Sequence, residues 1–250
     1  MSTPAPASRN WFDQGGQAYA SFRPDYPAAL AAYLASTVPE HRLAVDVGCG
    51  NGQLTTLLAD HFDTVWGFDP SQDQIAHAQA RGNLHYACAP AEALPPSAQG
   101  AQLITVAQAA HWFDLPAFYA QVRALAAPDA VLALISYGVP CLEADLQARF
   151  MDFYRDEIGP FWPPERHLVD SGYATLDFPF AEFATPAMNI ELSWTLEAFL
   201  GYVSTWSAVR HAREAGEQAV LERFAADLAA CWGQAPRSIS WPINLRIGQV

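Results

Sequence analysis

The sequence has 250 residues, of which 51% are hydrophobic, so it is long enough for one full α/β domain with a sizeable core. Its formal net charge is −13, from 13 basic residues that are all arginine and 26 acidic residues. This balance argues against nucleic acid or an anionic membrane as a partner, and the absence of lysine excludes Schiff-base chemistry.

The cysteines and the N-terminal residues point to the cellular setting. Neither C-x-x-C spacing nor short-loop pairing is found among Cys49, Cys88, Cys141 and Cys231, which argues against zinc and against a disulfide framework. No run of about 18 uncharged apolar residues is present, and residues 1–9 do not resemble a secretory signal. We expect a cytoplasmic protein with a disordered tail over residues 1–9 and a single domain over residues 10–250.

Residues 10–35 form a predicted N-terminal arm. Aromatic residues lead to the segment Arg-Pro-Asp-Tyr-Pro at 23–27, and an alanine-rich helix follows over residues 28–35. The aromatic residues could simply pack on the domain. Alternatively the arm folds over a ligand, and Tyr19 and Arg23 offer a phenol and a guanidinium to a carboxylate.

A glycine-rich loop follows the first predicted strand, at residues 43–47. Gly48, Gly50 and Gly52 stand at every second position, where the absence of a Cβ permits a tight turn. The helix predicted over residues 53–61 begins directly after the loop, so its free N–H groups face the same crevice. The sequence therefore predicts a ligand site where this strand ends.

Three kinds of nucleotide loop can be compared with this segment. A Walker loop needs a lysine, and the chain has none. The dinucleotide pattern G-x-G-x-x-G is weakened because Gln53 occupies the third glycine position. The remaining interpretation is the D-x-G-x-G-x-G loop of class I S-adenosylmethionine-dependent methyltransferases, which residues 46–52 resemble without a gap.

The second predicted strand, at residues 64–68, ends in an acidic residue. Asp69 stands at its tip, where a carboxylate can accept hydrogen bonds from both ribose hydroxyls of an adenosyl group. Alternatively Asp69 caps the helix predicted over residues 72–80, although Ser71 can do this equally well. A third strand is predicted over residues 84–88.

The fourth predicted strand is followed by polar and aromatic residues. Gln108, His111 and Trp112 come just past its carboxyl end, where parallel sheets hold their ligands. Trp112 could lie near a sulfonium, which an aromatic face attracts, or it could be a core residue. His111 could act as a base or a hydrogen-bond donor, or it could orient the loop by bonding a backbone carbonyl.

Strands and helices alternate from residue 43 to residue 137, which is typical of a doubly wound parallel sheet. The predicted fold is α/β, with a Rossmann-like, mostly parallel, seven-stranded sheet, an antiparallel last strand and a helical lid within residues 139–232. The elements expected after the fifth strand (131–136) are a helix at 142–158, an aromatic loop at 159–167, a strand at 180–194, helices at 196–204 and 217–231, and a final strand at 238–248.

Residues 11–138 as a whole resemble the class I methyltransferases of the type 11 family, and the His-Trp-Phe segment at 111–113 resembles relatives of trans-aconitate methyltransferase. One departure is at 127–130, Ala-Pro-Asp-Ala, where the family usually has Pro-Gly-Gly. The resemblance implies S-adenosylmethionine as cofactor, with Ala91 and Glu92 beside the adenine; the alternative for these two is a solvated loop.

The candidate residues fall into three groups. Those for the cofactor are Tyr19, Arg23, Asp46, Gly48, Cys49, Gly50, Gly52, Asp69, Pro70, Ala91, Glu92 and Gln108. The candidate catalytic residues are His111 and Trp112, and those expected near the substrate, although each could be packing instead, are Tyr137, Trp162, Arg166 and Trp206.

The acceptor is constrained by its ionisation, because methyl transfer is an in-line displacement that needs no metal. A carboxylate is already ionised, a thiol has a pKa of about 8.5, and a phenol, near 10, needs a base. The resemblance suggests a carboxylate of a small metabolite, whereas the few arginines argue against a tricarboxylate and the Trp-rich lid favours a flat or apolar body. Transfer to a thiol, phenol or amine, protein methylation, and a non-catalytic sensor remain alternatives, and the oligomeric state is left open.

Overall fold

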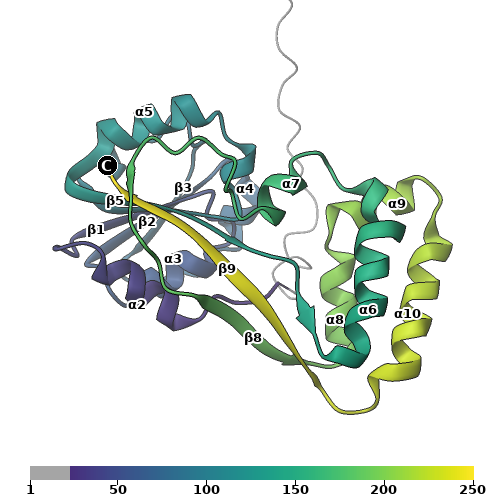
Figure 1. The fold of residues 1–250 in the computed structure, drawn as a ribbon. Coiled ribbons are helices and arrows are strands. Elements are labelled where there is room, and N and C mark those ends of the chain that lie inside the picture. Colours follow the sequence, from purple (N-terminus) through teal and green to yellow (C-terminus); the bar gives the residue numbers. More distant parts are fainter. Residues whose placement is uncertain (1–22) are drawn as a thin grey trace, which may run out of the picture.

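The computed structural model of the protein describes residues 23–250 (Figure 1). Tyr19 and the predicted tail therefore lie outside the described residues. The first half of the chain contains α2 (Ala28–Ser36), β1 (Leu43–Val47), α3 (Gln53–Leu58), β2 (Thr64–Asp69), α4 (Gln72–Ala76), β3 (Leu84–Cys88), η1 (Pro96–Ala98), β4 (Ala101–Ala107), η2 (Ala110–Trp112), α5 (Leu115–Leu125) and β5 (Ala126–Tyr137). The second half contains β6 (Cys141–Leu142), α6 (Ala144–Asp152), the π-helix η3 (Phe153–Glu157), η4 (Gly159–Phe161), α7 (Arg166–Asp170), β7 (Ala181–Glu182), β8 (Met188–Trp194), α8 (Leu196–Ser204), α9 (Ser207–Glu214), α10 (Gln218–Trp232) and β9 (Arg237–Gln249).

The strands form one sheet in the order β3-β2-β1-β4-β5-β9, with β6, β7 and β8 also paired to β9. The first five strands are parallel, and β9 runs antiparallel to its neighbours. Short β6 prolongs the line of β5 along one edge of β9, because Ser240 pairs with β6 and β8 on opposite edges. Likewise β7 lies on the β8 side, opposite β5, at Gln249. The sheet thus has seven strand positions, which confirms the predicted fold.

Both faces of the parallel sheet are covered by helices, as strands of nearly continuous apolar sequence require. Along β5, Val131, Ala133 and Ile135 face a core that contains the apolar residues of α2 and α3. Leu132 and Leu134 face the opposite core, which contains those of α5. The two layers of helices leave the carboxyl ends of β1, β2 and β4 at one edge of the sheet.

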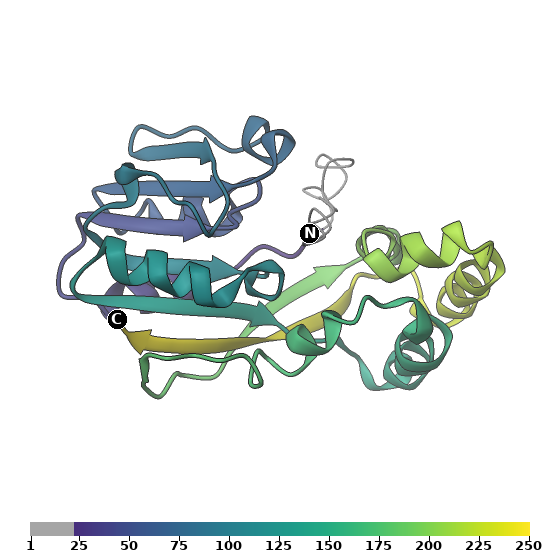
Figure 2. The same ribbon diagram turned by 90° about the horizontal axis from the view of Figure 1, so that it is seen from above.

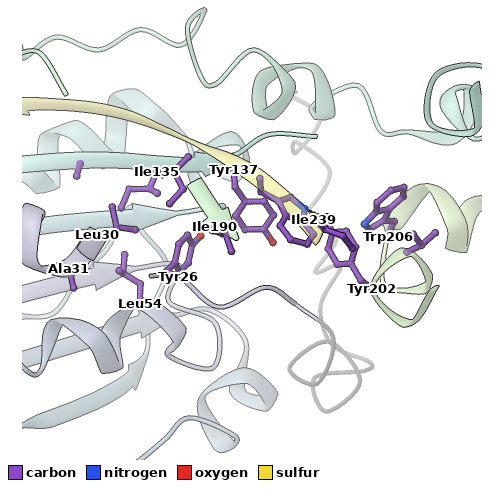
Figure 3. Packing of buried hydrophobic residues seen from close by; sticks show 14 of the residues in the cluster. Tyr26, Leu30, Ala31, Leu54, Ile135, Tyr137, Ile190, Tyr202, Trp206 and Ile239 are labelled. Carbon is purple, nitrogen blue, oxygen red and sulfur yellow. Dashed lines mark hydrogen bonds between the residues drawn. The ribbon is translucent and has the colours of Figure 1, made fainter. Parts of the chain in front are cut away.

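Four helices of the second half form a separate layer, which we call the helical lobe: α6 with its π-helical extension η3, α8, α9 and α10. Figure 2 shows the lobe at the far end of the long strands β5 and β9, beyond the carboxyl end of β5. The core continues into it: Tyr137 of β5 lies between Tyr26 and Tyr202 of α8 in the same buried cluster (Figure 3). The lobe therefore stands over the edge of the sheet where ligands bind in α/β folds.

Several local predictions beyond β5 were wrong. The helix predicted over residues 142–158 changes to a π-helix at Phe153, and the strand predicted over residues 180–194 is interrupted near Pro186, which cannot donate a ladder hydrogen bond. Short helix α7 begins at Arg166, inside the predicted loop. Helix α9 was missed; its buried residues, Ala208, Val209 and Ala212, are small and lie on one face of a largely polar helix.

Residues 127–130, where the sequence departs from the resembled family, form an irregular stretch at the start of β5 that contains Asp129. This residue has a φ of 61°, a left-handed conformation that aspartate tolerates better than most residues other than glycine. Its carboxylate accepts a hydrogen bond from the Gln249 side chain at 3.0 Å. This stretch lies at the amino end of β5, away from the carboxyl ends of the strands where the ligand is expected.

Two absences concern residues 23–250 alone. No helix in this range is long and apolar enough to cross a membrane, and no three His, Cys, Asp or Glu side chains gather as a metal site. All four cysteines of the chain lie in this range and are unpaired.

Candidate active site

The glycine loop is held against β2 by its backbone. The N–H groups of Gly48 and Cys49 both donate to the carbonyl oxygen of Phe68, at 2.7 and 3.0 Å. Gly48 and Gly52 have positive φ angles, and a Cβ at either would collide, with Ala109 at 2.5 Å and with the Tyr86 hydroxyl respectively. These two glycines are required by packing as well as by backbone conformation.

Gly50 is different, although its φ of 56° is also left-handed. A Cβ at Gly50 would meet only the side-chain oxygen of Gln74, at 3.8 Å, so this position faces open space. The Gly50 N–H donates to one carboxylate oxygen of Asp69 at 2.9 Å. The loop thus presents a bare stretch of backbone to the space beside Asp69.

Asp69 holds the loop and the start of α4 together. Besides Gly50, its carboxylate accepts the N–H of Ser71 at 2.9 Å. The helix α4 is capped by Ser71, whose hydroxyl oxygen accepts from the N–H of Gln74, so Asp69 is not the capping residue. Burial raises the pKa of Asp69, and the two N–H groups partly oppose this.

Asp46 lies behind the loop and is only 1% exposed. Its two carboxylate oxygens accept hydrogen bonds from the hydroxyls of Thr55, at 2.6 Å, and Thr105, at 2.8 Å. Burial raises the pKa of Asp46 to about 6, against the opposing effect of the two hydroxyls. Asp46 therefore titrates close to neutral pH, unlike an exposed aspartate.

A pocket opens at the carboxyl ends of β1, β2 and β4, enclosing about 690 Å³ including its opening to solvent. Its described lining consists of Tyr26, Asp46, Gly48, Cys49, Gly50, Asn51, Gln53, Leu54, Asp69, Gln74, Ala107, Gln108, Ala109, Trp112 and Tyr137. This lining carries two carboxylates and no arginine, so it favours a cationic ligand and would repel a pyrophosphate. The dinucleotide alternative is disfavoured on these grounds.

Gln74 supplies an observation that sequence reasoning missed. Its side-chain oxygen lines the pocket region, is buried, and accepts no hydrogen bond from any described residue. A buried acceptor without a partner costs about 1–3 kcal/mol, which a bound ligand with a donor group would recover. Together with the open space at Gly50, this orphaned oxygen fits the predicted cofactor, which carries an ammonium, ribose hydroxyls and an adenine amine.

The pocket brings together eight of the predicted residues: Asp46, Gly48, Cys49, Gly50, Asp69, Gln108, Trp112 and Tyr137. The other predicted residues of the described chain are not in this lining. Of the lining residues that sequence reasoning missed, Asn51, Gln53 and Leu54 belong to the glycine loop or the helix after it and could have been included. Tyr26 could also have been carried forward from the predicted arm.

The segment after β4 shows local strain and an exposed aromatic residue. Gln108 has a φ of 56°, which is uncommon for a residue with a side chain, and its amide donates to the carbonyl of Tyr137 at 3.3 Å. Such strain is typical of functional sites. Trp112 is 37% exposed at the pocket and so is not a core residue.

His111 is held by Tyr173, in the loop after α7. The Nδ1 atom of His111 and the Tyr173 hydroxyl are 2.9 Å apart. Burial raises the pKa of Tyr173, so the phenol keeps its proton. The Arg166 charge and the backbone N–H groups of Ala110 and His111 lower this pKa and only partly oppose the effect of burial. We therefore assign the phenol as the donor to Nδ1, which leaves the ring proton of His111 on Nε2.

The ring of His111 is also a very weak base. Burial, and secondly the Arg166 guanidinium, lower the pKa of His111 to about 3. The side chain is therefore neutral across the physiological pH range, and it can donate a hydrogen bond through Nε2 more readily than it can take a proton.

Other predicted residues are not part of this lining, and the structure gives their partners. Arg23 donates to the Tyr137 hydroxyl at 3.2 Å, and its guanidinium lies 5.7 Å from the ring centroid of Tyr202. The Glu92 carboxylate accepts the N–H of Asp114 at the start of α5, and Ala91 beside it is buried. Trp206 is buried in the helical lobe, where it packs on other rings.

Comparisons with known proteins agree with this geometry. The "Methyltransferase domain" family matches residues 44–129. A protein of Dictyostelium discoideum assigned as a methyltransferase is 35% identical, with 88% of this chain and 87% of that protein aligned. A solved structure from Anaeromyxobacter dehalogenans, assigned as a type II methyltransferase, is 42% identical with a TM-score of 0.84, over 91% of this chain and 98% of that one.

A protein of Saccharomyces cerevisiae named for S-adenosylmethionine-dependent methyl transfer is 28% identical, over 54% of this chain and 47% of its own length. The Dictyostelium relative is similar over most of both chains, and the Anaeromyxobacter structure has the same fold over most of this chain. The chain therefore belongs to the class I S-adenosylmethionine-dependent methyltransferases, with S-adenosylmethionine as its cofactor.

Proposed function

We propose that the protein transfers the methyl group to a carboxylate oxygen of a small metabolite and forms a methyl ester. When bound, S-adenosylmethionine supplies a methyl group on a positively charged sulfur. The observation that carries the choice of acceptor is the neutral His111, because the candidate catalytic segment offers no group that takes a proton at neutral pH. A carboxylate needs no such group, since it is already ionised.

The position proposed for the cofactor rests on the residues that line the pocket. Asp69 accepts the ribose hydroxyls with its remaining lone pairs, the bare backbone at Gly50 lies along the methionine end, and Asp46 supports the ammonium electrostatically. The negative lining of the pocket supports this arrangement. Trp112 presents an aromatic face to the sulfonium, whose attraction disappears in the neutral thioether product.

His111 and the helical lobe act on the acceptor side in this proposal. The Nε2–H of His111 donates a hydrogen bond that orients the acceptor, while the Tyr173 hydroxyl fixes the ring. The lobe, which falls within residues 139–232, acts as the lid of a single catalytic domain and keeps the site dry. The narrower likeness to trans-aconitate methyltransferase, and a cytoplasmic location, stay predictions.

Cofactor affinity should depend on pH through Asp46. The ammonium favours the ionised carboxylate, so affinity is complete above pH 6, the value to which burial raises the Asp46 pKa, and weakens as pH falls through it. Asp69, whose pKa burial also raises, acts in the same direction. Titration calorimetry between pH 8 and pH 5 should show the dissociation constant of the cofactor rising as pH falls. The total rise should be up to about tenfold for each unit by which the bound cofactor lowers the carboxylate pKa.

Asp46→Asn is the control, and most of the pH dependence should disappear in it. A dissociation constant that stays level over the whole range in the wild type would show that the Asp46 carboxylate does not sense the cofactor.

His111→Gln tests the nature of the acceptor. Because Gln can still donate a hydrogen bond, turnover should fall by less than about tenfold, whereas loss of a general base costs about 10²–10⁴-fold. The wild-type rate at saturating cofactor should be flat between about pH 6 and 9, since His111 titrates far below this window.

His167→Gln, a histidine of α7, serves as the matched control. A wild-type rate that rises with a pKa near 6.5, together with a large loss in His111→Gln, would make His111 the base and refute the carboxylate assignment.

A further inference from the structure

Arg166 lies at the start of α7, between the sheet and the helical lobe, and is fixed by two partners. Its Nε donates to the Asp170 carboxylate at 2.8 Å and to the Tyr154 hydroxyl at 3.0 Å. Tyr154 in turn donates to Asp170 at 2.9 Å. Tyr154 belongs to the π-helix η3, a helix type that is rare and concentrated at functional sites. The three side chains therefore form a closed set that holds the guanidinium in one orientation.

The other donors of this region have no acceptor within residues 23–250. Neither terminal nitrogen of Arg166 bonds a described residue, and the buried indole N–H of Trp162 has no described partner either. The Arg166 guanidinium lies 4.6 Å from the Trp162 ring centroid, so the two sets of donors are neighbours. The indole N–H of Trp162 is a buried donor without a described partner, which is costly, and this indicates that a ligand supplies an acceptor here.

The position of this group relates it to the acceptor side of the active site. The charge of Arg166 lowers the pKa of His111, and it also opposes the burial that raises the pKa of Tyr173 and of Tyr202. The terminal nitrogens of the Arg166 guanidinium are the donors that match a carboxylate in a bidentate pair.

Packing connects this group to the pocket as well. The ring of Trp206 lies 5.4 Å from that of Trp162 and 5.4 Å from that of Tyr202. The Arg23 guanidinium lies 5.7 Å from the Tyr202 ring centroid and donates to the hydroxyl of Tyr137, which lines the pocket.

The surrounding charges and rings limit what can bind. Asp170 already balances the charge of Arg166. Arg246 donates its hydrogen bonds to the Glu182 carboxylate and to the carbonyl oxygens of Tyr173 and Leu176. What remains for a ligand is the pair of terminal nitrogens of Arg166, which can hold one carboxylate by hydrogen bonds and leaves the other two carboxylates of a tricarboxylate without such a partner. The ring centroids of Tyr154 and Trp206 each lie 5.4 Å from that of Trp162, and 5.7 Å from each other. The surroundings of Arg166 are therefore apolar and aromatic.

We propose that Arg166 and Trp162 form the acceptor-recognition site, and that the acceptor is a monocarboxylate on a flat, apolar body. This rests on the proposed methyl transfer to a carboxylate. The guanidinium holds both carboxylate oxygens, and one of them uses a further lone pair to form the new bond to the methyl carbon. The bond between that carbon and sulfur breaks in the same step, and its electron pair stays on the sulfur, which becomes a neutral thioether. No proton is exchanged in the step, because the carboxylate enters ionised and leaves as a neutral ester.

The test uses trans-cinnamate as the probe, titrated into the full-length protein saturated with S-adenosylhomocysteine. Arg166→Lys keeps the positive charge but removes the two terminal nitrogens that donate side by side to a carboxylate. Cinnamate binding should therefore weaken by about 10- to 100-fold, while S-adenosylhomocysteine binding is unchanged. The control is Arg149→Lys, an arginine of the helical lobe that is equally exposed, 21% against 20%, and is also ion-paired. It should bind both ligands as the wild type does.

Trp162→Phe provides a second variant if Arg166→Lys fails to fold. It keeps a ring and removes only the indole N–H, and cinnamate should bind several-fold more weakly. Cinnamamide, which lacks the charge, and citrate, which carries three, should both bind at least about tenfold more weakly than cinnamate to the wild type.

Two failures can be told apart. If the enzyme methylates a carboxylate but Arg166→Lys binds cinnamate like the wild type, or citrate binds better than cinnamate, the recognition site is wrong and the proposed function stands. If only thiols, phenols or amines are methylated, the proposed function itself is wrong. A wild type that does not bind cinnamate contradicts the recognition site alone.

Discussion

Gly50→Val should abolish measurable binding of S-adenosylmethionine. The new side chain would enter the open space beside the loop, where a Cβ meets only the Gln74 side chain at 3.8 Å in the described structure. Overlap with a ligand and loss of the bare backbone surface should weaken binding by more than about 100-fold. Titration calorimetry at pH 8, where both pocket carboxylates are ionised, measures the effect.

The variant also strains the backbone, because Gly50 has a left-handed φ that costs a valine about 1–3 kcal/mol. Gly100→Val is the matched control, since Gly100 has a φ of 81°, lies at the amino end of β4, and has no atom within 4 Å of the place that a Cβ would take. It should lose similar stability in thermal unfolding and bind the cofactor normally. Equal binding by both variants would place the cofactor away from the loop.

Asp69→Ala should weaken cofactor binding by about 1.5–3 kcal/mol for each charge-assisted hydrogen bond lost, or about 10- to 160-fold per bond. The fold should survive, because the helix α4 keeps its cap at Ser71. Loss of the acceptor for the Gly50 N–H adds to the effect by loosening the loop.

Asp73→Ala, which removes an exposed carboxylate of α4, is the control for Asp69→Ala and should bind normally. Unchanged affinity in a folded Asp69→Ala protein would mean that Asp69 only braces the loop, and the assignment of the pocket would lose a main support.

The parallel half of the fold could be predicted from the sequence because its signals are local. Buried parallel strands read as apolar runs, and the glycine loop combines a backbone requirement at Gly48 and Gly52 with a bare surface at Gly50. The role of Asp69 could be predicted for the same reason, because a residue at the carboxyl end of β2 lies beside the glycine loop that follows the neighbouring strand β1.

The acceptor side could not be predicted in the same way, because it depends on contacts between distant segments. His111 was identified, but its character depends on Tyr173, which lies 62 positions further along the chain, and on the charge of Arg166. Gln74 gave no sequence signal, since an unpartnered buried oxygen is visible only in the packed structure. The π-helix that positions Tyr154 reads as ordinary helix in the sequence.

One measurement tests the central claim most directly. The protein is incubated with deuterated-methyl S-adenosylmethionine and a mixed panel of carboxylates, thiols, phenols and amines, and the products are identified by mass spectrometry. We predict S-adenosylhomocysteine release together with a labelled, alkali-labile methyl ester of an apolar monocarboxylate. Label recovered only on sulfur, phenolic oxygen or nitrogen, or cofactor binding without any labelled product, would contradict the account.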